Sequence, residues 1–207
     1  MYRLRAKVEF SKRTQPLVEI WWRDESGDAG GEQAPVNGLA DMRFAAGNVV
    51  RSYDASHISS ASFDAWHAFR IARGVAESGS DYALGDAFPH DVLLDQNGGV
   101  GFRKGCYVGQ EVVSRMQHRG TARRRILIAS SDHALPPEGT ALTANGRPLG
   151  TMGSSHGTSG LALVRIDKVK AAMDGGMPIL ADAVEVALSI PAFANFGFPE
   201  DAAAEDA

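Results

Sequence analysis

The stretch RKGCYVGQEVVSRMQHRG, residues 103–120, contains Cys106, the only cysteine among 207 residues. Arg103 and Lys104 come just before this cysteine. Positively charged neighbours stabilise a thiolate, which is the reactive form of the side chain. The more common fate of a free cysteine is burial as a small hydrophobic residue. The local sequence therefore leaves two interpretations of Cys106, a reactive thiol or a packed one.

The residues that follow Cys106 predict a helix from about Gly109 to Arg115. Gln110 and Glu111 would lie in its first turn, where side-chain acceptors suit the free backbone N–H groups. A helix N-terminus close to the sulfur also favours the thiolate. Glycines on both sides of the cysteine would let the backbone approach a ligand closely. These features make Cys106 the first candidate for a functional residue.

The overall composition is typical of a soluble globular protein with one large or two small domains. Hydrophobic residues make up 44% of the chain and charged residues 22%, which are ordinary values. No apolar run is long enough to span a bilayer, and the opening sequence MYRLRAKVEF lacks the apolar core of a secretory signal. We therefore expect a cytoplasmic protein with no membrane partner. A single cysteine cannot supply a multi-cysteine metal or cluster site, so we expect no metal site.

Positive charge is concentrated between residues 103 and 125, although the whole chain carries −4. This segment has one acid, Glu111, so its net charge is +6 and the rest of the chain carries −10. Its seven basic residues are Arg103, Lys104, Arg115, Arg119, Arg123, Arg124 and Arg125. A concentrated positive region on an acidic protein favours an anionic ligand or partner, although general nucleic-acid binding is not expected. A solvated basic face is the alternative.

The first 121 residues are predicted to mix strands and helices. Residues 2–10 alternate apolar and charged side chains, which is the pattern of a half-buried strand, and residues 17–22 form a second strand. Residues 24–37 are polar and Gly-rich, which indicates a loop. A helix is predicted after Ser62, with Arg70 beside its apolar stripe and Gly74 at its end. The residues of that stripe are Phe63, Trp66, Phe69 and Ala72.

After Arg123 the sequence changes to short strand-like runs separated by Pro, Gly and Asn. These runs are RILIAS, TALTANGRPLGTMG, GLALVRI and VEVALSI. Such spacing is typical of a small β-barrel or sandwich. We therefore expect an α+β chain with a first domain at residues 1–121, a C-terminal β-barrel at 122–192 and a disordered acidic tail at 193–207.

Three other motifs have simpler explanations than catalysis or ligand binding. GSSHG, residues 153–157, matches the G-x-S-x-G pattern of a hydrolase, but Ser155 lies in a Gly/Ser loop before a strand rather than on a strand-to-helix turn. The six histidines lack metal-binding spacings such as H-x-x-x-H. GGVG matches neither phosphate-binding pattern, so Gly98 and Gly99 are predicted to form a tight turn.

The string KGCYVGQE, residues 104–111, resembles the signature K-G-C-[FY]-x-G-Q-E of the YgfZ family of folate-binding proteins. The segments FPHDVLLDQ before it and SRMQHRGTARRRIL after it are similar to the same family's surrounding sequence. FRIARG upstream, and NGRPLGTMGSS and GLALVRI downstream, are also similar. The resemblance thus covers residues 1 to about 190.

The resemblance implies an α+β fold with a GcvT-like folate-binding domain and a C-terminal β-barrel. The family is related to the glycine cleavage T-protein, an aminomethyltransferase, and its members are implicated in iron–sulfur cluster assembly or repair. We therefore expect a tetrahydrofolate-binding accessory protein with iron–sulfur client or assembly proteins as partners. A tetrahydrofolate-dependent aminomethyl or one-carbon transferase is the alternative, so whether the chain is an enzyme stays open. A role in RNA binding or tRNA modification is a weaker alternative.

The resemblance also assigns roles to individual residues. Cys106 and Lys104 would be the reactive pair. The residues that would bind folate are Arg70, Gly105, Tyr107, Gly109, Gln110 and Glu111. Arg70 can offer a bidentate guanidinium to a carboxylate or a pterin edge, and a surface helix arginine is the alternative. Family members carry an N-terminal portion before the strand matched by residues 2–10, so we expect a truncated gene model, a fragment or half of a split protein.

Overall fold

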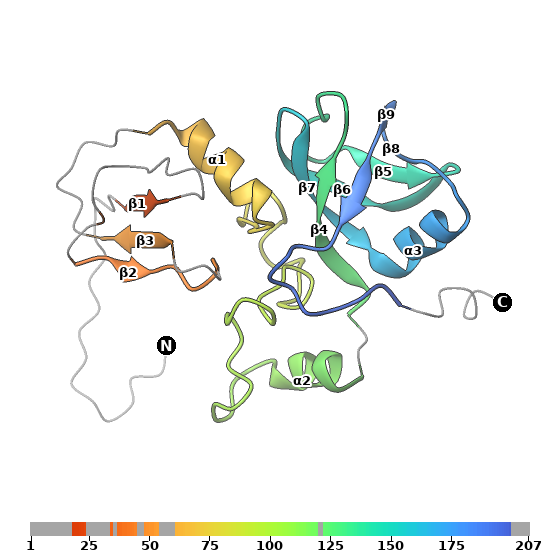
Figure 1. The fold of residues 1–207 in the computed structure, drawn as a ribbon. Coiled ribbons are helices and arrows are strands. Elements are labelled where there is room, and N and C mark those ends of the chain that lie inside the picture. Colours follow the sequence, from red (N-terminus) through yellow and green to blue (C-terminus); the bar gives the residue numbers. More distant parts are fainter. Residues whose placement is uncertain are drawn as a thin grey trace. The chain divides into compact units, whose positions relative to one another are not determined.

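A computed structural model describes residues 18–23, 34, 37–44, 48–53, 61–119 and 122–199 of the protein. The chain divides into two compact units (Figure 1). One unit comprises Met1–Asp41 and Asn48–Ser60, and the other comprises Met42–Gly47 and Ala61–Ala207. The segment that carries Cys106 belongs to the second unit, together with all the elements that surround it.

The smaller unit contains a three-stranded antiparallel sheet of order β1-β3-β2. Its strands are β1 (Glu19–Trp22), β2 (Leu39–Ala40) and β3 (Val49–Ser52). Trp22 and Val49 are paired in register, and both side chains are buried. β1 confirms the strand predicted at residues 17–22. The strand predicted at residues 2–10 lies outside the described residues.

Helix α1, Phe63–Ala72, opens the described part of the larger unit after Gly47. Ser62 caps it, because its hydroxyl accepts a hydrogen bond of 3.1 Å from a backbone N–H of the first turn. The helix buries Trp66, Phe69, Arg70 and Ile71. Phe63 and Ala72 are exposed, so the predicted apolar stripe is wrong at both ends. Arg70 takes part in the buried face instead of standing beside it.

Helix α2, Gln110–Arg119, confirms the helix predicted after Cys106 and extends four residues further than predicted. Few of its side chains pack against the rest of the unit. Val113 is its one buried residue among those whose side chains are described. Most of the helix surface is therefore accessible.

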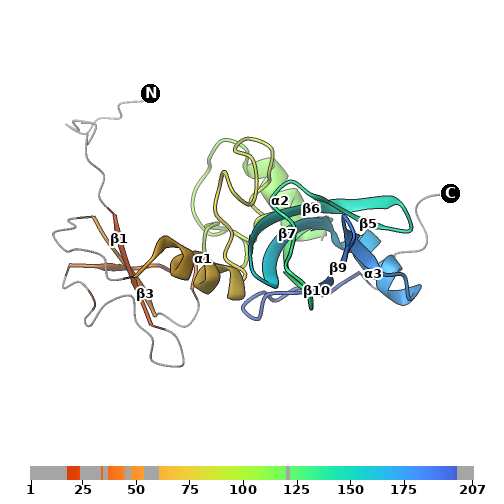
Figure 2. The same ribbon diagram turned by 90° about the horizontal axis from the view of Figure 1, so that it is seen from above.

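The larger unit ends in a β-barrel of seven antiparallel strands, which confirms the predicted C-terminal barrel. The sheet order is β10-β4-β7-β6-β5-β8-β9. The strands are β4 (Arg124–Ser130), β5 (Ala141–Ala144), β6 (Arg147–His156), β7 (Ser159–Arg165), β8 (Ile179–Ala181), β9 (Val184–Glu185) and β10 (Ala187–Ser189). The long strands β6 and β7 form a hairpin that curves strongly when seen from above (Figure 2).

The two ends of this sheet meet in one short segment of chain, residues 184–189. Its first part, β9, pairs with β8, and its second part, β10, pairs with β4. Between the two parts, the backbone N–H of Val186 donates a hydrogen bond of 2.9 Å to the carbonyl of Ile179. The barrel therefore closes through a segment that changes its partner strand halfway along, and this segment is the seam of the barrel.

Alternate residues of the barrel strands point inward and form the main hydrophobic core. Leu127, Leu142 and Val164 are fully buried in it. Helix α3, Ile166–Asp174, adds Val169 to the same cluster. Burial of apolar area on this scale is the chief stabilising contribution to a small domain.

Two details of the C-terminal half differ from the sequence-based expectation. Ser155 lies in strand β6, because the Gly/Ser stretch of GSSHG continues the strand instead of forming a loop. Its hydroxyl donates a hydrogen bond of 3.2 Å to the Pro136 carbonyl. Residues 193–198 of the predicted tail pack against the protein, because Phe193, Phe196 and Phe198 bury part of their rings against hydrophobic clusters of the larger unit.

The division into compact units differs from the predicted boundary after residue 121. Residues 61–119 group with the barrel rather than with the smaller unit. The domain boundary and the GcvT-like character of the first part of the chain stay predictions. Among the described residues, no helix has the length and apolar character needed to cross a membrane.

Gly74, two residues after the end of α1, lies against Pro191, two residues after the end of the last barrel strand. Its φ is +71°, and a Cβ at this position would lie 2.5 Å from Cγ of Pro191. Gly74→Ala is expected to lower the free energy of unfolding by about 2–4 kcal/mol, because the strain of a positive φ adds to overlap with the proline ring. Urea unfolding would measure the loss.

Gly85→Ala is the matched control. Gly85 has a φ of +85°, and a Cβ there would meet no described atom within 4 Å. Its expected loss is about 1 kcal/mol, from backbone strain alone. Equal losses in the two variants would show that the contact of Gly74 with Pro191 contributes nothing.

Candidate functional site

The thiol of Cys106 is exposed, on the loop that leads into α2. No described residue hydrogen-bonds to it. The helix begins four residues later, at Gln110, so its first turn lies near the cysteine in sequence without including it. The structure therefore excludes the packed interpretation of Cys106 and leaves the sulfur accessible to a partner molecule.

Lys104 and Tyr107 contact each other across the cysteine. The Lys104 ammonium nitrogen lies 4.5 Å from the centroid of the Tyr107 ring, a distance typical of a cation–π contact. The backbone N–H of Tyr107 donates a hydrogen bond of 3.2 Å to Oε1 of Gln110. These contacts join three of the predicted site residues into one turn at the start of α2, with Glu111 in the first turn of the helix.

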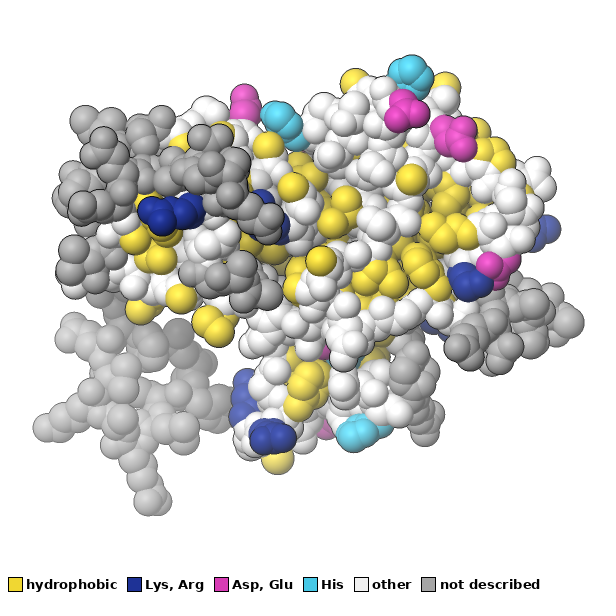
Figure 3. Space-filling model, viewed as in Figure 1, with side chains coloured by type: hydrophobic (Ala, Val, Ile, Leu, Met, Phe, Trp, Pro, Cys, Tyr) yellow, Lys and Arg dark blue, Asp and Glu magenta, His cyan; other side chains and the backbone are white. Residues whose placement is uncertain are grey.

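The glycines of the motif border open space. A Cβ at Gly105 or at Gly109 would meet no described atom within 4 Å, and Gly109 has a φ of +87° that favours glycine. Val108 between them is fully exposed. The loop thus exposes a thiol and an aliphatic side chain, and Lys and Arg side chains lie on the lobe that contains α2 (Figure 3).

His90 connects this loop and α2 to the body of the unit. Its ring is buried, and its Nε2 lies 3.3 Å from Oε1 of Gln117 on α2. The ring of Phe102, just before the motif, meets the His90 ring with centroids 6.2 Å apart. The carbonyl of His90 accepts a hydrogen bond of 2.7 Å from Arg125 of strand β4. His90 therefore links the barrel to both sides of the Cys106 loop.

The positive segment at residues 103–125 is not one continuous basic surface. Arg124 forms an ion pair of 2.8 Å with Asp91 and one of 3.3 Å with Asp86. These contacts, chiefly the hydrogen bond to Asp91, raise the pKa of Arg124 above its ordinary value. Arg125 is buried and forms an ion pair of 2.7 Å with Asp95. Two of the seven cations are thus paired with carboxylates of the protein, and Arg103, Lys104 and Arg115 remain exposed.

Arg70 lies in a buried network away from the loop. Its side chain is completely buried and forms an ion pair of 2.6 Å with the equally buried Asp81. Nη2 also donates a hydrogen bond of 2.7 Å to Oγ of Ser154 in strand β6. The remaining donors reach the Val75 carbonyl at 3.2 Å and Nδ1 of His67 at 3.2 and 2.9 Å. All five N–H groups of Arg70 therefore have protein partners, and the alternative of a surface arginine is wrong.

Sequence reasoning missed the partners of Arg70. The carboxylate of Asp81 accepts hydrogen bonds of 2.7 Å from the backbone N–H groups of Glu77 and Ser154. A Cβ at Gly153 would lie 2.6 Å from Oδ1 of Asp81, so only glycine lets β6 approach this closely. The first half of GSSHG thus joins α1 to the barrel. The sequence signal was the motif itself, whose Gly/Ser composition predicts a loop instead.

Among the described residues, no group of three or more His, Cys, Asp or Glu side chains is placed to hold a metal ion. The predicted site residues instead form two sets. The residues from Lys104 to Glu111 form one exposed loop and helix start, and Arg70 bonds to none of them. Their roles in reaction and folate binding stay predictions.

Comparison with known proteins places the chain near a group of iron–sulfur assembly proteins. Residues 123–196 match the family described as CAF17, C-terminal beta-barrel domain. Human mitochondrial iron-sulfur cluster assembly factor IBA57 is 38% identical over 114 residues, or 52% of this chain and 32% of the human protein. The mouse protein of the same name is 34% identical over 111 residues, or 51% of this chain and 31% of its own length.

A longer match is the mitochondrial IBA57 homolog of Pyricularia oryzae, which is 29% identical over 196 residues, or 80% of this chain and 50% of the fungal protein. This chain resembles the CAF17/IBA57 proteins. It spans roughly a third of the mammalian IBA57 proteins and half of the fungal one. These comparisons support a relation to proteins that have a CAF17-type C-terminal barrel. Membership of the YgfZ family itself stays a prediction.

The expected cytoplasmic location is contradicted by these relatives, which are all named as mitochondrial. The expectation rested on the lack of an apolar signal core at the start of the sequence. Mitochondrial targeting segments are amphipathic, rich in Arg and Ser and poor in acids, so an apolar core does not identify them. The criterion was suited to secretion and could not distinguish cytoplasm from mitochondrion.

Proposed function

We propose that this chain takes part in iron–sulfur cluster assembly and that the Cys106 thiolate is its reactive group. The observation that carries the proposal is the exposed, unbonded thiol of the chain's single cysteine, in a protein similar to IBA57 assembly factors. Thiolates are the usual protein ligands of iron–sulfur clusters. The exposed loop gives a cluster or an iron-bearing partner direct access to the sulfur.

A single thiolate also defines what the partner must supply. Clusters of the common types take four protein ligands, and this chain offers Cys106 alone as a thiolate. The remaining ligands would come from an iron–sulfur client or assembly protein that docks over the loop. Exposed Val108 and the exposed cations Arg103 and Lys104 lie within three residues of Cys106 in sequence, so an acidic partner surface with an apolar contact would be complementary.

The test is restoration of iron–sulfur enzymes in human cells depleted of IBA57. The chain, directed to mitochondria, is expected to restore the activity and cluster content of iron–sulfur enzymes above those of depleted cells. An enzyme without a cluster serves as the control and should not change. Failure of a stably expressed chain to restore any cluster enzyme would contradict the proposed role.

We also propose tetrahydrofolate as a ligand of the loop at residues 104–111, on the strength of the resemblance in KGCYVGQE. The loop residues fit such a role, because Tyr107 is partly exposed and both glycines border open space. Arg70 fits less well, because a folate would have to displace one of its buried protein partners. We therefore assign folate contact to the loop and a structural part to Arg70.

A calorimetric titration of the chain with tetrahydrofolate tests this ligand. Binding is expected, and Tyr107→Ala should weaken it by about tenfold, because loss of an aromatic stacking surface costs roughly 1–1.5 kcal/mol. Tyr53→Ala, at an exposed tyrosine of the smaller unit, is the matched control. A heat of mixing equal to dilution would exclude folate binding by this chain, whatever the outcome for cluster assembly.

A further inference from the structure

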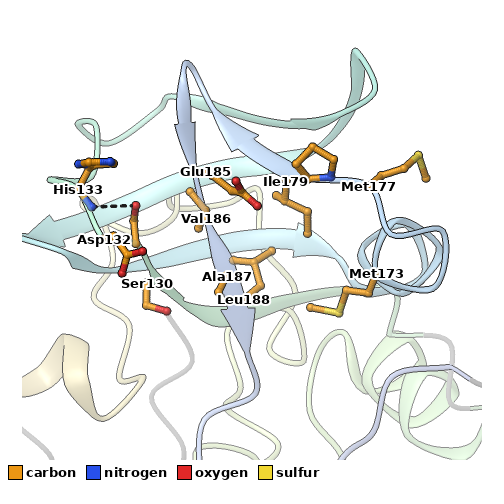
Figure 4. Close-up of a pocket in the computed structure, with 12 residues that line it drawn as sticks. Ser130, Asp132, His133, Met173, Met177, Ile179, Glu185, Val186, Ala187 and Leu188 are labelled. Carbon is orange, nitrogen blue, oxygen red and sulfur yellow. Dashed lines mark hydrogen bonds between the residues drawn. The ribbon is translucent and has the colours of Figure 1, made fainter.

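A groove lies at the seam of the barrel, on a different set of residues from the Cys106 loop. Its volume is about 620 Å³, within the range of sites that bind small molecules or peptide side chains. It crosses the segment 184–189 between the end of β4 and the end of α3 (Figure 4). The groove lies where the segment changes its partner strand, so its shape follows directly from the way the barrel closes.

One end and the middle of the groove carry acidic side chains. Asp132 follows β4 and Glu185 belongs to β9, and both side chains are exposed. Neither carboxylate has an ion-pair partner among the described residues, and the lining includes no lysine or arginine. His133 lies at the same end as Asp132, whereas Glu185 lies nearer the middle, beside Ile179 (Figure 4). This acidic part of the groove is therefore complementary to a positively charged group.

The other end is apolar and adaptable. Met173, Met177 and Ile179 line it and lie together in Figure 4. Met173 is 40% exposed, although it is a large hydrophobic side chain. Unbranched methionines adjust to apolar groups of different shapes, and this property suits them to peptide-binding surfaces. Ala187, small and exposed, lies between the two ends and leaves room for a ligand to cross the strand.

We propose that this seam groove binds an extended peptide segment of a partner protein that carries an apolar side chain two residues from a lysine or arginine, on the same face of the extended segment. The apolar side chain would pack between Met173 and Met177, and the cation would pair with Asp132 and Glu185. The acidic C-terminal sequence PEDAAAEDA does not suit the site, because its carboxylates would meet those of the groove. The proposal is independent of the cluster chemistry assigned to Cys106.

Two-dimensional amide NMR with capped synthetic peptides tests the proposal on the full chain. The basic probe is acetyl-Lys-Ser-Leu-Ser-Lys-amide. The matched probes are acetyl-Glu-Ser-Leu-Ser-Glu-amide, which reverses the charge, and acetyl-Lys-Ser-Ser-Ser-Lys-amide, which removes the apolar side chain. The basic probe is expected to shift the amide signals of residues 130–133 and 185–188 in a saturable way. The two matched probes should shift them several times less.

Variants separate the charge of the groove from its shape. Asp132→Asn with Glu185→Gln is expected to weaken the basic probe by about fivefold, the size expected for two exposed ion pairs. Glu138→Gln with Asp182→Asn makes the same change in charge at exposed positions outside the groove and should leave binding unchanged. Ala187→Leu should block the path of the peptide across the strand and weaken binding of the basic probe.

Three outcomes would overturn the proposal. The first is no saturable shift with the basic probe. The second is an equal response to the acidic probe, which would show non-specific contact. The third is shifts at the same residues that grow with protein concentration and without peptide, which would make a second copy of the chain the occupant.

Discussion

Replacement of Asp81 by alanine is expected to lower the free energy of unfolding by about 3–5 kcal/mol, because it leaves the fully buried Arg70 guanidinium without its main counter-charge. The two side chains are both 0% exposed and form an ion pair of 2.6 Å. Asp81 also accepts the backbone N–H groups of Glu77 and Ser154, and both would lose a buried partner. The loss should appear as a lower urea midpoint with an unchanged slope.

A double-mutant cycle with Arg70→Met identifies the cause of that loss. The double variant has no uncompensated buried charge, so its destabilisation should be smaller than the sum of the two single losses. Asp86→Ala removes the exposed partner of Arg124, whose contact is 3.3 Å long, and should cost less than about 1 kcal/mol. Losses that simply add would show that the Arg70–Asp81 ion pair does not determine the stability of this network.

The barrel could be predicted from sequence because its signals are local. Short alternating runs separated by Gly, Pro and Asn define strands wherever they occur, and RILIAS, GLALVRI and VEVALSI all became strands. The closure could not be predicted, because VEVALSI looks like one strand. Only the pairing of its first residues with β8 and of its last with β4 shows that it bridges the sheet edges.

The environment of Arg70 could not be predicted, because its partners are distant in sequence. Asp81 is eleven positions away and Ser154 eighty-four. Helical periodicity placed Arg70 beside the apolar stripe. Its side chain is buried instead, because the carboxylate of Asp81 and the hydroxyl of Ser154 accept its hydrogen bonds. A single sequence contains no signal for such long-range pairs.

For the Cys106 loop, the sequence indicated the helix and the motif, and the structure supplied the exposure. Neighbouring cations and glycines are compatible with either a packed or an open thiol. Val113 is the buried residue of α2 among those whose side chains are described, and the loop residues Cys106 and Val108 are exposed. That outcome depends on how little of α2 the body of the unit covers, which is a property of tertiary packing.

Replacement of Cys106 by alanine is expected to abolish the support that the chain gives to iron–sulfur enzymes. The thiol is exposed and unbonded, so its loss should change the free energy of unfolding by less than about 0.5 kcal/mol. Cys106→Ser should fail as well, because a hydroxyl keeps the size of the side chain without the thiolate. Ser114→Ala on exposed α2 is the matched control and should retain full support.

The most direct measurement compares the native chain with Cys106→Ala in IBA57-depleted cells at equal protein levels, with the cluster content of an iron–sulfur enzyme as the readout. Restoration by the native chain and depleted-cell levels with the alanine variant are expected if the exposed sulfur performs the chemistry. Equal restoration by both proteins would contradict a reactive Cys106.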